Sequence, residues 1–386
     1  MLFADTQRTD SSPKRATESD FAFLDRSAWS PIGVVRELME ACLASYPVGE
    51  AKELIERIQC GDARHFASAS FELFIHDYLR RLGMSLTPHP ELPNGSTKRP
   101  DFLVECPDGQ KLYLEAVCAS DDTARDSAAE ARKAVALQVL DSEHNPNFMV
   151  SIDSDGDPAT QPSGRRLATE VLTWLNTLDP DALLDLSATG GLEALPELCW
   201  QHEEWCVRIR PIPVNVEARG KQRRLIGARG FGASWIDGWS PIRDAVTSKA
   251  RRYGDLDLPL IVAVNVDTFN LDPIDEAQAL FGQEQFVFSR TKPDQEPRME
   301  RAPNGAWRGP AGPRGKRASG AWLFNNLSPY TLARRRHTLY VNPAATHPIP
   351  HSFLLVPHML VIEGYLRRFE GRDLATALGL SAAWPE

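Results

Sequence analysis

The chain contains no run of about 18 apolar residues, which is the length that a membrane-spanning helix requires. Its first 20 residues are polar and lack the apolar stretch of a secretion signal. The six cysteines are scattered, without the Cys-x-x-Cys spacing of a structural zinc site or the regular pattern of a disulfide framework. These absences predict a cytoplasmic protein with no membrane partner, no disulfides and no structural zinc.

The net charge of -9 excludes a protein whose whole surface attracts nucleic acid. Basic residues nevertheless cluster in three segments, 219–229, 298–317 and 334–337. Any one cluster is compatible with a solvated loop or the flank of a strand. Three together indicate a surface that faces a polyanion, because phosphate contacts supply most sequence-independent affinity for nucleic acid.

The length of 386 residues, with 42% hydrophobic content, suits one large core or two modest domains. Residues 1–20, rich in Ser, Thr and charge, predict a disordered tail. Helical periodicity predicts an N-terminal helical segment over 21–65. Alternating helix and strand patterns predict a core over 66–180 and an α/β extension over 181–386. In the extension, residues 290–319 are rich in Gly, Pro and Arg and predict a long mobile loop.

The order of these patterns predicts an α/β fold with a mixed central sheet flanked by helices. A helix over 66–82 ends before Gly83 and is followed by three short strands, of which the last two are DFLVEC and KLYLEAV. A helix from about Thr123 to Leu140 and the strand FMVSI continue the alternation. Further on, PLIVAVNV is an unbroken apolar run, which is typical of a strand covered on both faces.

Two acidic residues stand where this sheet is predicted to be apolar. Glu115 lies between Leu114 and Ala116, and a buried charge is costly unless it is paired or binds a cation. Asp101 follows Pro100 at the start of the neighbouring strand. Two close carboxylates repel each other unless a proton or a metal ion lies between them. Mg²⁺ usually takes one or two carboxylates with carbonyls and waters, so this pair predicts a site for Mg²⁺ or Mn²⁺.

Glu72, on the helix that precedes the sheet, could complete that site or hold a metal-bound water. The simpler alternative is that Glu115 pairs with Arg99 or Lys111 and that Asp101 caps a turn. The order of the helix and the strands favours the metal site.

With Glu72 in the first helix, Pro100-Asp101 at the second strand and Glu115 in the third, the chain resembles the PD-(D/E)xK nuclease superfamily. More narrowly, FELFIHDYLRRLGMSLTPHPELP, TKRPDFLV and YLEAV are similar to a group of bacterial proteins that share this core, and later segments extend the similarity to about residue 350. The resemblance implies a restriction-endonuclease-like core. It also implies metal-dependent hydrolysis of phosphodiester bonds, with Asp101, Glu115 and Glu72 as metal ligands and catalytic residues.

One position departs from the family pattern. The family has Lys two residues after the last acid, where it positions or activates the attacking water, and this chain has Val117 there. Either another ammonium reaches the same space, with Lys133 and Lys249 as the candidates, or hydrolysis has been lost. Lys98 and Lys111 are less suitable because of the direction of their strands.

The sequence therefore predicts a metal-dependent nuclease that acts on nucleic acid, with DNA favoured over RNA. The alternative is a catalytically weak or inactive nuclease-like module that binds nucleic acid or protein. A third hypothesis is a subunit of a bacterial defence or mobile-element system whose chemistry appears only on assembly. A homodimer and a larger complex both stay open.

Overall fold

The computed structural model describes residues 1–15, 18–120, 127–221, 224–231, 238–267, 271–287 and 298–386. The chain divides into two compact units. The first unit comprises Met1–Ser12, Ser19–Thr123 and Asp237–Glu386, and the second comprises Pro13–Glu18 and Ala124–Ile236. The boundaries predicted at residues 66 and 180 do not coincide with these units. The reason is topological, because the second unit is inserted in the chain between two strands that are neighbours in one sheet.

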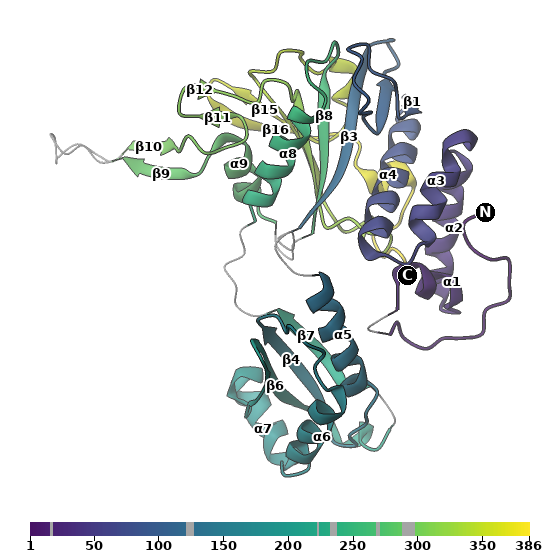
Figure 1. Cartoon of the computed structure of the whole chain (residues 1–386), viewed down its shortest axis with the longest axis vertical. Coiled ribbons are helices and arrows are strands. Elements are labelled where there is room, and N and C mark those ends of the chain that lie inside the picture. The colour runs from purple at the N-terminus through teal and green to yellow at the C-terminus, as the bar shows by residue number, and fades with distance from the viewer. Residues whose placement is uncertain (16–17, 121–126, 222–223, 232–237, 268–270, 288–297) are drawn as a thin grey trace. The chain divides into compact units, whose positions relative to one another are not determined.

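The first unit is built on a mixed sheet of eight strands (Figure 1). Three neighbouring pairs, β3 with β8, β8 with β13 and β14 with β15, are parallel, and the remaining pairs are antiparallel. In sheet order the strands are β1 (Ser85–Pro88), β2 (Phe102–Glu105), β3 (Lys111–Ser120), β8 (Leu260–Asp267), β13 (Gly320–Asn325), β14 (His337–Val341), β15 (His358–Ile362) and β16 (Tyr365–Phe369). The predicted mixed sheet is therefore confirmed.

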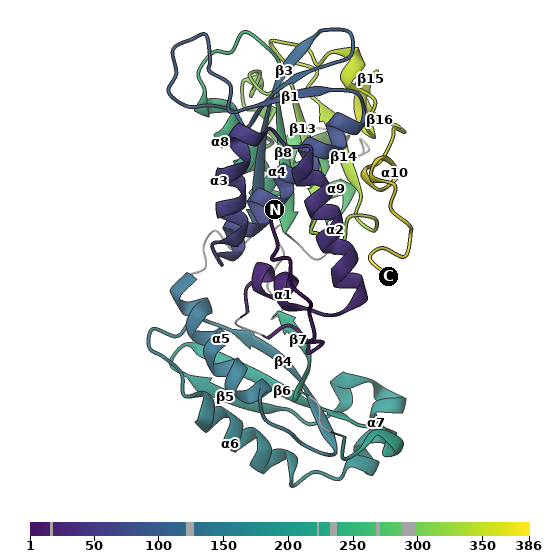
Figure 2. The same ribbon diagram turned by 90° about the vertical axis from the view of Figure 1, so that its right-hand side faces the viewer.

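Helices cover both faces of this sheet (Figures 1 and 2). One face carries α1 (Asp20–Arg26), α2 (Ser30–Ala44), α3 (Val48–Gln59), α4 (Ala63–Arg81) and the short α10 (Leu374–Leu378). The other face carries α8 (Ser240–Arg252) and α9 (Pro273–Phe281). Helix α4 begins where the Asp62 side chain accepts hydrogen bonds from the backbone N–H groups of Arg64 and His65, and it ends before Gly83, whose φ of 88° favours glycine.

The two faces of β3 belong to two different cores. Leu112 and Leu114 pack on the α4 side, whereas Tyr113 packs on the α8 side. This division follows from the alternation of side chains along a strand. Strand β8 is buried from Leu260 to Val266, as its unbroken apolar run predicts.

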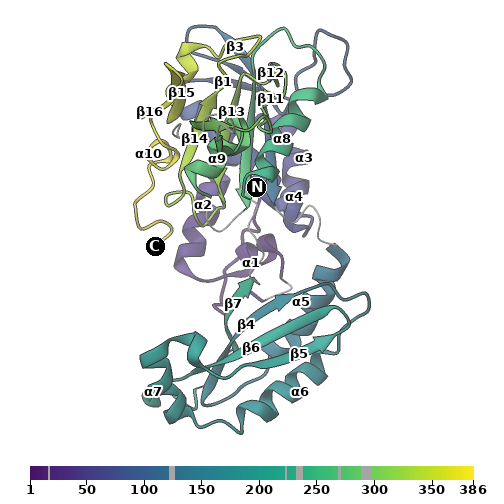
Figure 3. The same ribbon diagram turned by 90° about the vertical axis from the view of Figure 1, so that its left-hand side faces the viewer.

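The second unit has a separate sheet and a separate core (Figure 3). Its four strands are, in sheet order, β5 (Leu198–His202), β6 (Trp205–Pro213), β4 (Phe148–Asp155) and β7 (Ile226–Phe231). Helices α5 (Ser127–Asp141) and α6 (Gly164–Leu175) supply Leu140 and Leu167 to the core that they share with Trp205. Helix α7 (Pro180–Gly190) precedes β5 and has no buried residue.

Two predictions for irregular segments are wrong. The described part of residues 1–20 includes the buried Leu2 and Phe3, whose backbone N–H groups donate to Glu40 Oε1 at 2.7 and 2.8 Å. Apolar anchors thus attach the start of the chain to α2 despite its polar composition. In the segment 290–319, residues 290–297 lie outside the described part, and the remainder forms strands β10 (Arg298–Arg301), β11 (Arg308–Gly309) and β12 (Gly312–Pro313) rather than a long loop. Strand β10 pairs with β9 (Glu284–Val287).

None of the described helices combines the length and the apolar character that a bilayer crossing requires.

Candidate functional site

Glu115 is a deeply buried acid of the predicted site. Strand β3 directs it to the face that α8 covers, and the residue is 2% exposed. Its Oε1 accepts a hydrogen bond from Lys249 Nζ at 2.5 Å, and its Oε2 accepts one from the Tyr253 hydroxyl. Arg252 Nη1 lies 3.8 Å from Oε1. Lys249, Arg252 and Tyr253 can all reach one carboxylate because spacings of three and four residues share a face of a helix.

Asp101 directly precedes β2, and its side chain continues the hydrogen bonding between β2 and β3. Strand β2 begins at Phe102, which pairs with Leu114. One step further, Oδ2 of Asp101 accepts a hydrogen bond from the backbone N–H of Ala116 at 2.6 Å. The carbonyl of Ala116 points to the same side, since the N–H and C=O of one strand residue share a direction. Oδ1 of Asp101 accepts no hydrogen bond from any described residue.

The surroundings of Asp101 are strongly unfavourable to its negative charge. Burial raises the pKa of its carboxyl well above the usual value, and the negative charges of Glu115 and Glu72 raise it further. The Ala116 N–H and the Lys249 ammonium act in the opposite direction and only partly compensate. Three acidic groups therefore act on one another here, and a bound cation would relieve the repulsion between them.

Glu72 approaches this cluster from α4 and is 2% exposed. Both of its oxygens accept hydrogen bonds from the Arg57 guanidinium, the Nη1–Oε1 distance being 2.8 Å. Ser68 Oγ lies 3.3 Å from Oε1. This two-point contact pairs Glu72 with a positive charge and fixes its orientation.

Three residues of the site offer oxygen ligands to a divalent cation. Asp101 offers the free Oδ1, Ala116 offers a carbonyl, and the Glu115 oxygens keep lone pairs beyond their present hydrogen bonds. This oxygen set suits Mg²⁺, which needs few carboxylates when carbonyls and waters complete its shell. Within the described ranges there is no group of three or more His, Cys, Asp or Glu residues arranged to hold a metal ion. For Glu72, direct ligation requires giving up a contact with Arg57, so its part as a ligand stays a prediction.

Of the two candidate lysines, the structure brings Lys249 to Glu115. Lys133 lies on α5 in the second unit, where its Nζ contacts Glu130 Oε1 at 2.7 Å and Asp157 Oδ1 at 2.6 Å. Lys133 thus has two carboxylate partners within the second unit, and its part as the missing ammonium stays a prediction.

The simpler pairings considered for Glu115 are also wrong. Arg99 pairs with Glu91 at 2.7 Å, and Lys111 pairs with Glu105 at 3.0 Å. Both pairs are largely exposed, and neither involves the buried Glu115, whose partners are Lys249 and Tyr253.

Sequence reasoning missed two residues of the site, Arg57 and Tyr253. Arg57 falls in the last turn of the amphipathic α3, where a basic residue is typical of a solvated surface. Tyr253 stands four residues after Lys249, and that spacing is the one signal that could have found it.

The basic segment 334–337 is largely structural. Arg336 Nη2 lies 2.9 Å from Oε1 of the buried Glu276, and His337 is 3% exposed. In segment 219–229, residues 222–223 lie outside the described part, and Arg219 pairs with Asp181 at 2.6 Å within the second unit. The described residues of 298–317 are the remaining basic surface.

Comparison with known proteins finds no family model, no curated protein and no solved structure that matches this chain. The geometry of the site therefore carries the functional argument by itself.

Proposed function

We propose that the first unit hydrolyses phosphodiester bonds of nucleic acid with the help of a divalent cation. The observation that carries this proposal is the contact of the Lys249 ammonium with Glu115 beside the crowded carboxyl of Asp101. Val117 leaves the third motif without a lysine, and Lys249 supplies an ammonium to the same acidic residue from a different element. Two carboxylates and one ammonium group are the side chains that metal-dependent hydrolysis of a phosphodiester uses.

Each residue has a distinct part in this proposal. Asp101, Glu115 and the Ala116 carbonyl would hold Mg²⁺ or Mn²⁺, which polarises a phosphoryl oxygen and lowers the pKa of a bound water. Lys249 offsets negative charge on the phosphate, and the Tyr253 hydroxyl holds the Glu115 carboxylate in place. Glu72, positioned by Arg57, adds to the negative field at Asp101.

The test is cleavage of single- and double-stranded DNA and RNA in Mg²⁺ and in Mn²⁺ by the full chain. Asp101→Asn and Glu115→Gln remove a negative charge with little change of shape. We expect each to lower the rate at least about 100-fold, since a group that acts on the developing charge is typically worth that much. Glu105→Gln, which alters an exposed carboxylate on the neighbouring strand, is the matched control and should cleave like the wild type. Full activity in Asp101→Asn would refute the proposal.

A second candidate function is a nuclease-like binding module without hydrolysis. It is favoured by the engagement of both Glu115 oxygens with Lys249 and Tyr253, which reduces the capacity of Glu115 for metal. This candidate predicts nucleic-acid binding that needs no divalent cation, falls steeply with salt, and is accompanied by no cleavage under any of these conditions.

A further inference from the structure

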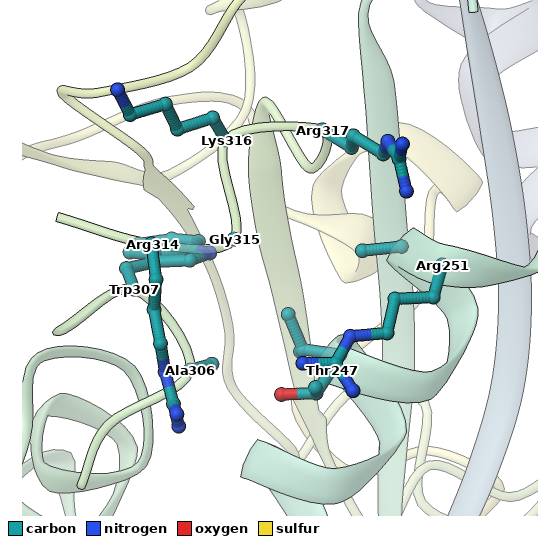
Figure 4. Close-up of a pocket in the computed structure, with 10 residues that line it drawn as sticks. Thr247, Arg251, Ala306, Trp307, Arg314, Gly315, Lys316 and Arg317 are labelled. Carbon is teal, nitrogen blue, oxygen red and sulfur yellow. The ribbon is translucent and has the colours of Figure 1, made fainter. Parts of the chain in front are cut away.

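A pocket of about 230 Å³ lies between α8 and the segment 306–317 (Figure 4). Figure 4 shows Thr247 and Arg251 of α8 facing Trp307 and Arg314 across it. Four of its lining residues carry a positive charge and none is acidic. The lining is Val246, Thr247, Ala250, Arg251, Ala306, Trp307, Arg314, Gly315, Lys316 and Arg317.

Most of this positive charge is not neutralised by neighbours. The exposed Arg251 and Lys316 have no ion-pair partner among the residues that the structure describes. Arg314 uses Nε to donate to the Gly305 carbonyl at 2.8 Å, which leaves both Nη groups available. Arg317 is the exception, because its Nη2 lies 2.8 Å from Asp255. Because like charges repel, a bound anion would stabilise the basic side chains that line this pocket.

The wall of the pocket also holds two buried polar atoms with no hydrogen-bond partner among the described residues. These are the hydroxyl of Thr247 and the indole N–H of Trp307, a residue that is 4% exposed. A buried donor without a partner costs free energy, and such atoms are infrequent in native proteins. A group bound in the pocket can supply the missing acceptor.

The loop that forms one side of the pocket is shaped by Gly315. Its φ is 62°, and a Cβ at this position would lie 2.6 Å from the Ala306 carbonyl oxygen and 3.2 Å from the Trp307 ring. Only glycine allows the two stretches of backbone to approach this closely. The basic residues on either side of Gly315 are thereby held against the indole.

We propose that this pocket binds a phosphate group. Its volume is below the roughly 300–1,000 Å³ typical of pockets for drug-sized ligands, so it suits a phosphate with part of a sugar rather than a large cofactor. Arg and Lys side chains are the usual partners of phosphate oxygens. The assignment of this phosphate to a nucleic-acid strand rests on the proposed function. Phosphate binding itself does not.

Helix α8 connects the pocket with the candidate site. Thr247 and Arg251 line the pocket, while Lys249 and Tyr253 contact Glu115. Residues two positions apart point to different sides of a helix, so the pocket and the acidic cluster lie on different sides of α8. A nucleic-acid strand that occupies both sites must therefore pass around this helix.

The first experiment measures binding without cleavage. A fluorescein-labelled single-stranded DNA oligonucleotide is titrated with the full chain in EDTA at several salt concentrations, using anisotropy. Arg251→Ala and Lys316→Ala should each weaken binding about three- to tenfold and reduce the slope of log affinity against log salt by about 1. Arg367→Ala on β16, an exposed arginine without a described partner, is the matched control and should bind like the wild type.

The second experiment uses Thr247→Val, which removes the hydroxyl and keeps the shape. In the ligand-free protein this variant should melt at the same temperature as the wild type or higher, because an unsatisfied polar atom is lost. Its affinity for the oligonucleotide should fall. An unchanged or higher melting temperature together with weaker binding would show that the Thr247 hydroxyl contacts the ligand. A hydroxyl with only a structural role would not give this combination.

Unchanged binding of the oligonucleotide, of AMP and of inorganic phosphate in all three pocket variants would overturn the proposal, even if cleavage still depends on Asp101. Weakened binding in the pocket variants, with no cleavage by the wild type, would support the pocket and refute the proposed hydrolysis. Parallel titrations with AMP and with inorganic phosphate distinguish the source of the phosphate. If the variants lose affinity for these two probes and not for the oligonucleotide, the phosphate site stands and its assignment to nucleic acid is overturned.

Discussion

At the scale of single residues, His76 shows how the core controls a titratable group. It is 3% exposed, and its ring lies 4.7 Å from that of Tyr46 and 6.0 Å from that of Phe102. Its Nδ1 has no hydrogen-bond partner in the part of the chain that the structure describes. Burial, opposed by the nearby Asp77, lowers the pKa of the imidazole to about 4. The side chain is therefore neutral near pH 7.

Replacing His76 by Phe should reduce the loss of stability in acid. In the unfolded chain the histidine binds a proton below about pH 6.5, whereas the folded state resists protonation down to about pH 4. The unfolded state thus binds more protons between these values, and the free energy of unfolding falls as the pH falls through this window. The contribution of His76 is at most about 3 kcal/mol.

Urea denaturation of wild type and His76→Phe at pH 7 and pH 4.5 measures this difference. Some acid sensitivity should persist in the variant, because burial also lowers the pKa of His337 to about 4. An identical decrease in both proteins would show that His76 titrates normally in the folded state.

At the scale of elements, strands and helices were predictable where the apolar residues follow one clear pattern along the sequence. Strand β8 and helix α8 follow from an apolar run and from helical periodicity. Their partners were not predictable, since Lys249 and Glu115 are 134 residues apart and a whole unit is inserted between them. The burial of His76 was not predictable either, because α4 is covered by the sheet on one side and by α2 and α3 on the other, whereas amphipathic patterns assume one covered face.

The proposal that Lys249 takes the place of a lysine missing at position 117 leads to a rescue experiment. Val117 shares a face of β3 with Glu115, two residues away, so a lysine there would point into the space that Lys249 now reaches. Lys249→Met should abolish cleavage and lower the free energy of unfolding by about 1–3 kcal/mol, since a buried carboxylate loses a charged partner. Adding Val117→Lys to Lys249→Met should restore part of the activity.

Cleavage rate and urea denaturation are measured on the single and double variants. Lys111→Met, which removes an exposed lysine from the same strand, is the control and should change neither quantity appreciably. If the double variant regains stability but not cleavage, the role of the ammonium is structural and not catalytic.

At the scale of the whole molecule, the two units have separate hydrophobic cores, and this separation determines how the chain unfolds. Trp322 belongs to a core of the first unit and packs against Tyr78 and Phe324. Trp205 belongs to the core of the second unit and packs against Trp200. Both tryptophans are completely buried. Each unit thus holds its own apolar centre, which is the condition for separate unfolding.

Trp205→Ala and Trp322→Ala should therefore affect different unfolding transitions. Loss of a buried tryptophan costs about 3–5 kcal/mol, because contacts are lost and a cavity is left. Calorimetry of the full chain should show a lowered transition for the second unit in Trp205→Ala and a lowered transition for the first unit in Trp322→Ala. Phosphodiesterase activity at a temperature where the first unit is folded should survive Trp205→Ala, since Asp101, Glu115 and Lys249 all belong to the first unit. A single transition lowered equally by both variants would mean that the two cores unfold together and that the second unit is an integral part of the fold carrying the site.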